Sequence, residues 1–225
     1  MSANLLHTII LSGVFLTLFV SAEILFHKFN WKAEASRKYV HGSTGILTML
    51  FPPLLTSHWY VLALCGSFLV ILILSKKLGF LQSIHGINRV TRGSLLYPIV
   101  VYFCYLIYQH YGLFMFYYIP ILILALSDPM AAVVGKKLPY GEFTIFKHAK
   151  TLSGCSGFFF SAILISSTLL ILLEEISIIH TLIIAVSVSV STTISEAITH
   201  KGYDNLTIPA SAVITLIFIH SIISI

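Results

Sequence analysis

Residues 5–25 are LLHTIILSGVFLTLFVSAEIL, an apolar run whose one acidic side chain is Glu23. A helix that crosses the hydrocarbon core of a bilayer needs about 20 such residues. No Lys or Arg precedes the run, so it lacks the basic start of a cleaved signal peptide. We therefore predict that it is the first membrane span.

The composition of the whole chain extends this conclusion. Of the 225 residues, 57% are hydrophobic and 9% are charged, whereas about 25% are charged in a soluble domain. A water-facing surface cannot be covered by so few polar groups. The length leaves no room for an added soluble domain, so residues 1–225 are predicted to form a single transmembrane domain.

Further apolar runs predict an all-α, polytopic membrane bundle of about eight helices. The predicted spans are Leu5–Leu25, Gly42–Thr56, Trp59–Leu74, Leu95–Tyr108, Gly112–Leu126, Gly154–Leu173, Ile178–Ser195 and Thr207–Ile225.

The basic residues give an independent test of these spans. All 13 Lys and Arg residues follow the first, third, fifth or seventh span, so they fall in alternate loops. Basic loops remain cytoplasmic, which places both termini on the non-cytoplasmic side. No dense block of Lys and Arg is present, so no nucleic-acid partner is predicted. Three cysteines, Cys65, Cys104 and Cys155, lie in apolar runs and are expected to be reduced.

The first two basic loops contain candidate anion ligands. If this segment is helical, Arg37 and His41 share a face at the mouth of the second span, and Arg37, Lys38 and His41 could capture an anion there. Arg92 precedes Gly93, which lacks a Cβ and would let the backbone approach a phosphate. The alternative for the Lys and Arg residues is ordinary anchoring at the membrane surface.

The third basic region contains an acid among apolar residues. Such an acid at membrane depth usually faces a cavity and has a function, so Asp128 is a candidate Mg²⁺ ligand. The alternative is that Asp128 caps a helix that restarts at Pro129. Lys150-Thr151-x-x-Gly154 lies at the start of the sixth span, where a helix N-terminus can bind phosphate.

The last basic loop holds two carboxylates and an amide, from Glu196, Asp204 and Asn205. A turn with a helix cap is the alternative for the Asp-Asn pair. All these clusters lie on one side of the membrane. Carboxylate-held Mg²⁺ together with Lys and Arg is what phosphoryl transfer from a nucleotide requires.

Four motifs occur in a fixed order between about residues 34 and 209. They are Arg37-Lys38-x-x-His41-x-x-x-Gly45, Asp128-x-x-Ala131-x-x-x-Gly135, Lys150-Thr151-x-x-Gly154, and Glu196-Ala197 followed by Gly202-x-Asp204-Asn205-Leu206-x-x-Pro209. This series resembles the family of dolichol kinase, phytol kinase and CTP-dependent diacylglycerol kinase. The family often has glycine where this chain has Ser127.

The resemblance implies a membrane-embedded transferase that uses CTP and Mg²⁺ to phosphorylate a lipid alcohol: a polyprenol, phytol or geranylgeraniol, dolichol or diacylglycerol. Its membrane would be a bacterial or archaeal inner membrane, or a eukaryotic endomembrane or plastid membrane, with the active site facing the cytoplasm. The residues carried over as catalytic are Asp128, Lys150, Asp204 and Glu196, with Asp128 and Asp204 as metal ligands. The candidates for nucleotide or phosphate binding within these motifs are Arg37, Lys38, His41, Lys150, Thr151, Gly154 and Asn205, and Arg92 joins them from its position beside Gly93. Asp204 and Glu196 are both candidates for the general base.

Two alternatives use the same residues. A cytidylyltransferase would form a CDP-lipid from CTP and a phospholipid, and would release pyrophosphate. A small transporter or flippase would use intramembrane acids as a proton relay, with charges spaced across the membrane. The charges here are instead concentrated on one side, which favours the enzyme.

Overall fold

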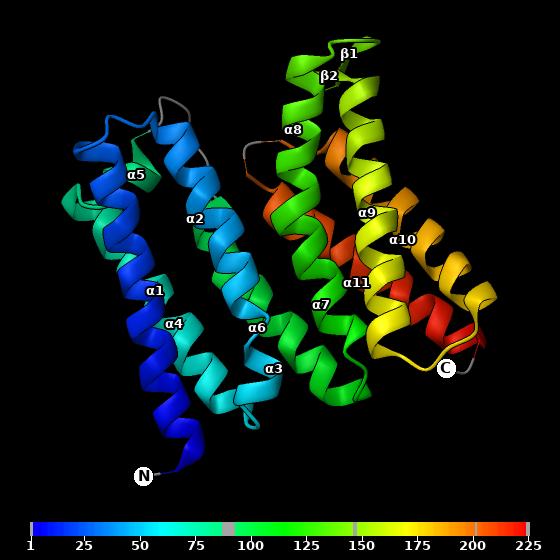
Figure 1. The fold of residues 1–225 in the computed structure, drawn as a ribbon, viewed down its shortest axis with the longest axis horizontal. Helices are drawn as coiled ribbons and strands as arrows, with labels where there is room; N and C mark the ends of the chain where they lie inside the picture. The colour runs from blue at the N-terminus through cyan, green and yellow to red at the C-terminus, as the bar shows by residue number, and fades with distance from the viewer. Residues whose placement is uncertain (1, 87–92, 146–147, 201, 224–225) are drawn as a thin grey trace.

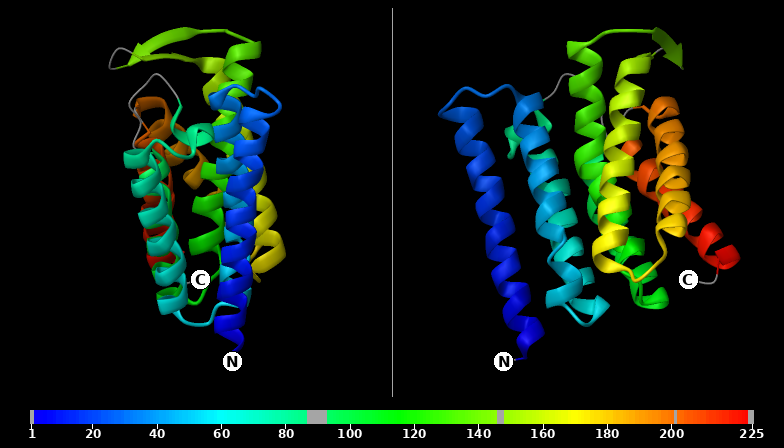
Figure 2. Two further views of the ribbon diagram at one scale, coloured as in Figure 1. Left: turned by 90° about the vertical axis from the view of Figure 1, so that its left-hand side faces the viewer. Right: turned by 45° about the vertical axis from the view of Figure 1, so that its right-hand side comes forward.

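The structure is a computed structural model that describes residues 2–86, 93–145, 148–200 and 202–223. Most of its helices run between the two ends of one bundle (Figures 1 and 2). Its elements are α1 (Ala3–His27), α2 (Ala33–Thr48), α3 (Phe51–Leu54), α4 (His58–Leu78), α5 (Gln82–His85), α6 (Gly93–Tyr111), α7 (Met115–Leu122), the π-helical turn η1 (Ile123–Ser127), α8 (Asp128–Lys137), β1 (Glu142–Ile145), β2 (His148–Thr151), α9 (Leu152–Leu173), α10 (Ile178–Ile198) and α11 (Asp204–Ile223).

The prediction of a polytopic helical membrane bundle is confirmed, although the count of eight spans is not. Within the described residues, six helical stretches are long and apolar enough to cross a membrane. They are Ala3–His27, His58–Leu78, Met115–Lys137, Leu152–Leu173, Ile178–Ile198 and Asp204–Ile223. The other two predicted spans, Gly42–Thr56 and Leu95–Tyr108, correspond to α2 with α3 and to α6. Helix α2 is too short, with 16 residues. The hydropathy of α6 is lowered by its tyrosines.

Helix α2 begins at Ala33, before the predicted start of the second span at Gly42, so Arg37 and His41 do lie on one helix. Two further expectations are corrected. The fifth stretch continues as helix through Asp128 to Lys137, whereas the prediction ended it at Leu126. A short antiparallel hairpin, β1–β2, precedes α9 although no strand was predicted.

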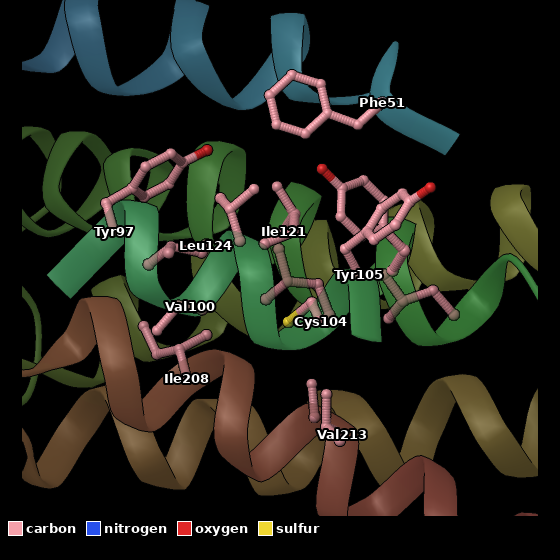
Figure 3. Packing of buried hydrophobic residues seen from close by; sticks show 14 of the residues in the cluster. Phe51, Tyr97, Val100, Cys104, Tyr105, Ile121, Leu124, Ile208 and Val213 are labelled. Carbon is pink, nitrogen blue, oxygen red and sulfur yellow. The ribbon is translucent and has the colours of Figure 1, made fainter. Parts of the chain in front are cut away.

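The outward faces of the helices suit a hydrocarbon solvent. On α11, Ile214, Phe218 and Ile222 repeat every four residues and are 66%, 64% and 65% exposed. Soluble monomers rarely expose a contiguous apolar patch of this kind. The core lies between the helices. Figure 3 shows Val100 and Cys104 of α6 facing Ile208 and Val213 of α11.

The basic residues gather at one end of the bundle. Lys28 follows α1, and the pairs Lys76–Lys77 and Lys136–Lys137 end α4 and α8. These helix ends lie beside α5 and the hairpin, whereas the first turn of α1 and the last turn of α11 lie toward the opposite end (Figure 2). The segregation of charge predicted from the sequence is therefore present in the described part of the fold.

Close helix contacts depend on glycine. A Cβ built on Gly45 of α2 would lie 2.3 Å from the Cβ of Ala125 in η1, so only glycine permits this approach. Likewise, a Cβ on Gly154 of α9 would lie 3.1 Å from the carbonyl oxygen of Ala131 in α8. The helix that carries Asp128 is thus held tightly between α2 and α9.

This packing makes a testable prediction. Gly45→Ala should lower the free energy of unfolding by about 1–3 kcal/mol, because the added methyl group overpacks the contact between α2 and η1. Thermal unfolding of the purified protein in detergent measures the change. Gly66→Ala in α4 is the matched control, since a Cβ there meets nothing within 4 Å. Equal melting temperatures for the two variants would contradict the proposed contact.

Candidate active site

Most of the predicted site residues line one cavity. It opens among α1, α2, α4, α6 and the first turns of α8 and α11. The predicted residues among its lining are Arg37, Lys38, His41, Asp128, Asp204 and Asn205. They come from three segments that are far apart in sequence, so the fold brings the separate motifs together.

Helix α2 forms one wall of the cavity. Arg37, His41, Thr44 and Thr48 are spaced by three or four residues, so they lie on one face of the helix. All four line the cavity. The face changes along the helix from a cation, through an imidazole, to hydroxyls. Thr44 and Thr48 were missed by the sequence analysis, although their spacing from His41 could have identified them.

The π-helical turn η1 positions Asp128. In a π turn, each N–H bonds the carbonyl five residues earlier, so the Leu124 carbonyl is in register with residue 129. That residue is proline, which has no N–H. His41 Nε2 lies 3.2 Å from the Leu124 oxygen and donates to it when Nε2 carries the proton. The imidazole therefore satisfies a carbonyl that the helix itself leaves without a donor.

Asp128 does not serve as the helix cap considered from the sequence. An N-cap residue has an extended backbone and accepts a hydrogen bond from the next turn. Here Ser127 and Asp128 both have right-handed helical dihedrals, and no side-chain cap bond forms at this junction. The carboxylate instead lines the cavity.

Asp204 and Asn205 stand at the start of α11, opposite Asp128. One oxygen of Asp204 accepts the Asn205 backbone N–H at 2.9 Å. The Asn205 side-chain nitrogen donates to the Gly93 carbonyl at 2.8 Å. A Cβ on Gly93 would lie 2.9 Å from that nitrogen, so glycine allows the close contact. This bond holds the amide and leaves its oxygen as an acceptor.

The site contains carboxylates that repel one another and cations that offset part of this repulsion. Asp128 interacts unfavourably with Asp204 and Glu196, and favourably with Lys150 and Arg37. Like charges held close together destabilise each other unless cations neutralise them. The cluster is therefore suited to take up a further positive ion.

The available donors suit Mg²⁺ that arrives with a nucleotide. Within the described residues, no group of three or more His, Cys, Asp or Glu side chains could hold a metal ion by itself. Mg²⁺ is usually bound by one or two carboxylates, with waters and substrate phosphates completing its shell. Asp128, Asp204 and the Asn205 amide oxygen fit this pattern.

The third motif, Lys150-Thr151-x-x-Gly154, lies outside the lining of the cavity. Lys150 donates to the Glu196 carboxylate and, at 3.0 Å, to the Glu196 carbonyl. The side chains of Lys150 and Glu196 are 25% and 7% exposed. Thr151 caps α9 by accepting the Gly154 N–H at 3.0 Å. None of these four residues lines the cavity, and Arg92 lies outside the described residues.

Comparison with known proteins supports the motif-based resemblance. Over 191 residues, the chain is 28% identical to a protein named phytol kinase from Synechocystis sp., with 84% of this chain and 81% of the relative covered. This chain is a distant homologue of that phytol kinase. The resemblance predicted from the motifs is therefore confirmed over nearly the full length, and the homology supports an enzyme of the lipid alcohol kinase type. No family model matches the chain, and no solved structure matches it.

The buried ion pair of this phytol kinase homologue gives a second prediction. Lys150→Met should destabilise the protein by roughly 3–5 kcal/mol, because it leaves the Glu196 carboxylate buried without its partner. The double variant Lys150→Met/Glu196→Gln should recover much of this loss. Melting temperatures of the wild type, both single variants and the double variant measure the coupling. Additive effects of the two single changes would contradict the ion pair.

Proposed function

We propose that the chain transfers the terminal phosphoryl group of CTP to the hydroxyl of a membrane lipid alcohol, and so forms a lipid monophosphate and CDP. The observation that carries the proposal is that one and the same cavity is lined by Asp128, Asp204 and Arg37 at one end and by phenylalanines at the other. Such a cavity suits a polar nucleotide and an apolar acceptor that meet at its middle. The homology to a phytol kinase supports the same activity.

Asp128 and Asp204 are proposed to hold Mg²⁺–CTP, with the Asn205 amide oxygen in support. Bound Mg²⁺ would neutralise charge on the phosphates and on the transferring group. The side chains of the protein would hold the triphosphate in position and offset its negative charge. Arg37 and Lys38 are proposed to bind the triphosphate, and His41 to position it. Arg92, Thr151 and Gly154 remain proposed phosphate ligands.

The reaction needs a new bond from the alcohol oxygen to phosphorus, while the bond from phosphorus to the CDP oxygen breaks. The alcohol proton must go to a base. Asp204 lines the cavity and Glu196 does not, so we favour Asp204. Lys150 is proposed to approach the transferred phosphate, with Glu196 orienting its ammonium group.

The choice of CTP follows from the resemblance of the motifs. We further propose that the whole chain forms one domain, in which α2 with α3 and α6 complete eight traversals. Both termini would then lie on the non-cytoplasmic side. The basic end, where the carboxylates gather, would face cytoplasmic CTP.

A labelling experiment tests the activity. The protein, purified in detergent with Mg²⁺ and CTP labelled on its γ-phosphate, is offered phytol, geranylgeraniol, a long polyprenol and diacylglycerol in parallel. Label in a lipid supports the kinase. If instead CTP labelled on its α-phosphate yields a CDP-lipid from phosphatidic acid, the cytidylyltransferase alternative replaces it. If neither label moves, the enzyme proposal fails.

The metal role of Asp128 is testable by substitution. Asp128→Asn should lower kcat by on the order of 100-fold or more, because an amide is a poor substitute for a carboxylate that holds a cation. The melting temperature and elution volume should match those of the wild type, since the side chain keeps its size. Near-normal turnover by a well-folded variant would sink the assignment.

The nucleotide role of α2 has its own test. Arg37→Ala/Lys38→Ala should raise the KM for CTP by about tenfold or more, because charge-assisted bonds to the triphosphate are lost. Lys28→Ala/Lys32→Ala is the matched control, since these lysines lie at the same end but outside the cavity lining. If both pairs change only membrane insertion and leave KM unaltered, ordinary anchoring explains the residues.

A further inference from the structure

Beyond its charged end, the cavity continues as an apolar arm. Phe15 and Phe19 of α1, Phe51 of α3 and Phe68 of α4 line this arm. It lies between the first helices of the bundle and starts beside Thr44 and Thr48 on α2. An occupant of this arm would leave water and contact aromatic rings.

The arm is closed at its far end by three packed rings, the aromatic floor: Phe15, Phe51 and Phe68. The centroid of Phe15 lies 6.0 Å from that of Phe51 and 4.9 Å from that of Phe68. Below them, Leu11, Leu55 and Leu64 are at most 2% exposed, and none of these leucines lines the cavity. On the side away from the acidic residues, the lining of the cavity therefore ends at Phe15, at Phe51 and at Cys65 of α4.

The length of the arm follows from helix geometry. His41 stands beside the acidic residues, and Phe51 in the floor is ten positions further along the chain. Helix α2 carries the wall from His41 to Thr48, about 10 Å at 1.5 Å of rise per residue, and Phe51 follows after a turn. One extended chain of a few isoprene units spans such a distance, whereas a long polyprenol greatly exceeds it.

The upper end of the arm holds a group of hydroxyls. Tyr97 of α6 is 8% exposed, lines the cavity and points toward α2 (Figure 3), where its ring centroid lies 5.3 Å from that of His41. Its hydroxyl interacts with the hydroxyls of Thr44 and Thr48, which also line the cavity. These groups can donate and accept hydrogen bonds beside an apolar space. The hydroxyl of a bound alcohol would find its partners here.

We propose that the aromatic floor limits the acceptor to an alcohol with one chain of a few isoprene units, whose hydroxyl binds beside Tyr97. This inference rests on the proposed kinase activity and narrows its acceptor. Long polyprenols are excluded because the floor blocks their chain. Diacylglycerol is excluded because the single arm cannot hold two acyl chains.

The test compares acceptors and floor variants at saturating CTP. The acceptors are farnesol, geranylgeraniol, phytol, a long polyprenol and diacylglycerol. The wild type should phosphorylate the short-chain alcohols with a kcat/KM higher by roughly tenfold or more. Phe51→Ala should shift the preference toward the polyprenol. Cys65→Met, which fills the arm from α4, should shift it toward farnesol.

Controls separate specificity from damage to the fold. Phe51→Leu is a milder version of the floor variant, and Phe158→Leu alters an equally buried phenylalanine that does not line the cavity. Only the former should alter the order of acceptors. Tyr97→Phe should raise the KM for the alcohol by roughly three- to tenfold and leave the KM for CTP unchanged.

Each outcome decides between the proposals. If the wild type phosphorylates an alcohol but all floor variants keep its order of acceptors, the inference about the floor is overturned and the kinase proposal stands. Efficient use of the long polyprenol or of diacylglycerol by the wild type overturns it equally. If no alcohol is phosphorylated, the proposed function fails and this inference fails with it.

Discussion

The hydrogen bond from the His41 imidazole to the Leu124 carbonyl is the contact on which the site depends. Inside a bilayer there is no water to satisfy a backbone carbonyl, so irregular helix geometry persists only where protein or a cavity supplies a partner. The π turn and Pro129 together leave such a carbonyl, and α2 supplies the donor. Gly45 lets α2 come close enough to do so. The interruption in the helix, the position of Asp128 and the wall of the cavity are thus parts of one arrangement.

The cavity that results is polar at one end and apolar at the other. Carboxylates and cations gather where the helices meet the basic end of the bundle, and aromatic rings close the interior. This gradient suits the proposed transfer from a water-soluble donor to a membrane-dissolved acceptor. The lining of the cavity ends at Phe15, Phe51 and Cys65 among the described residues, which weighs against the transporter alternative because a transport path would continue across the bundle.

At the opposite end of the bundle, a side-chain contact joins two segments that are distant in sequence. Glu174, just after α9, accepts the backbone N–H of Met115 at the start of α7 at 2.8 Å. This contact holds the beginning of the stretch that carries Asp128, far from the charged residues. The two ends therefore differ in kind. One end carries the carboxylates and cations of the candidate site. The other end holds the helices that carry these residues in place.

Hydropathy and charge in the sequence sufficed for the membrane class, for most helix positions and for the segregation of Lys and Arg, because each depends on local composition. The ordered motifs also selected six residues that line the cavity. Tertiary structure alone decided the π turn, the pairing of Lys150 with Glu196 and the aromatic floor. Arg37, Asp128 and Asp204 meet only through packing between distant helices, and no local period records such contacts. Phe15, Phe51 and Phe68 looked like ordinary apolar residues of three different segments, because the space that they enclose exists only once those segments pack together.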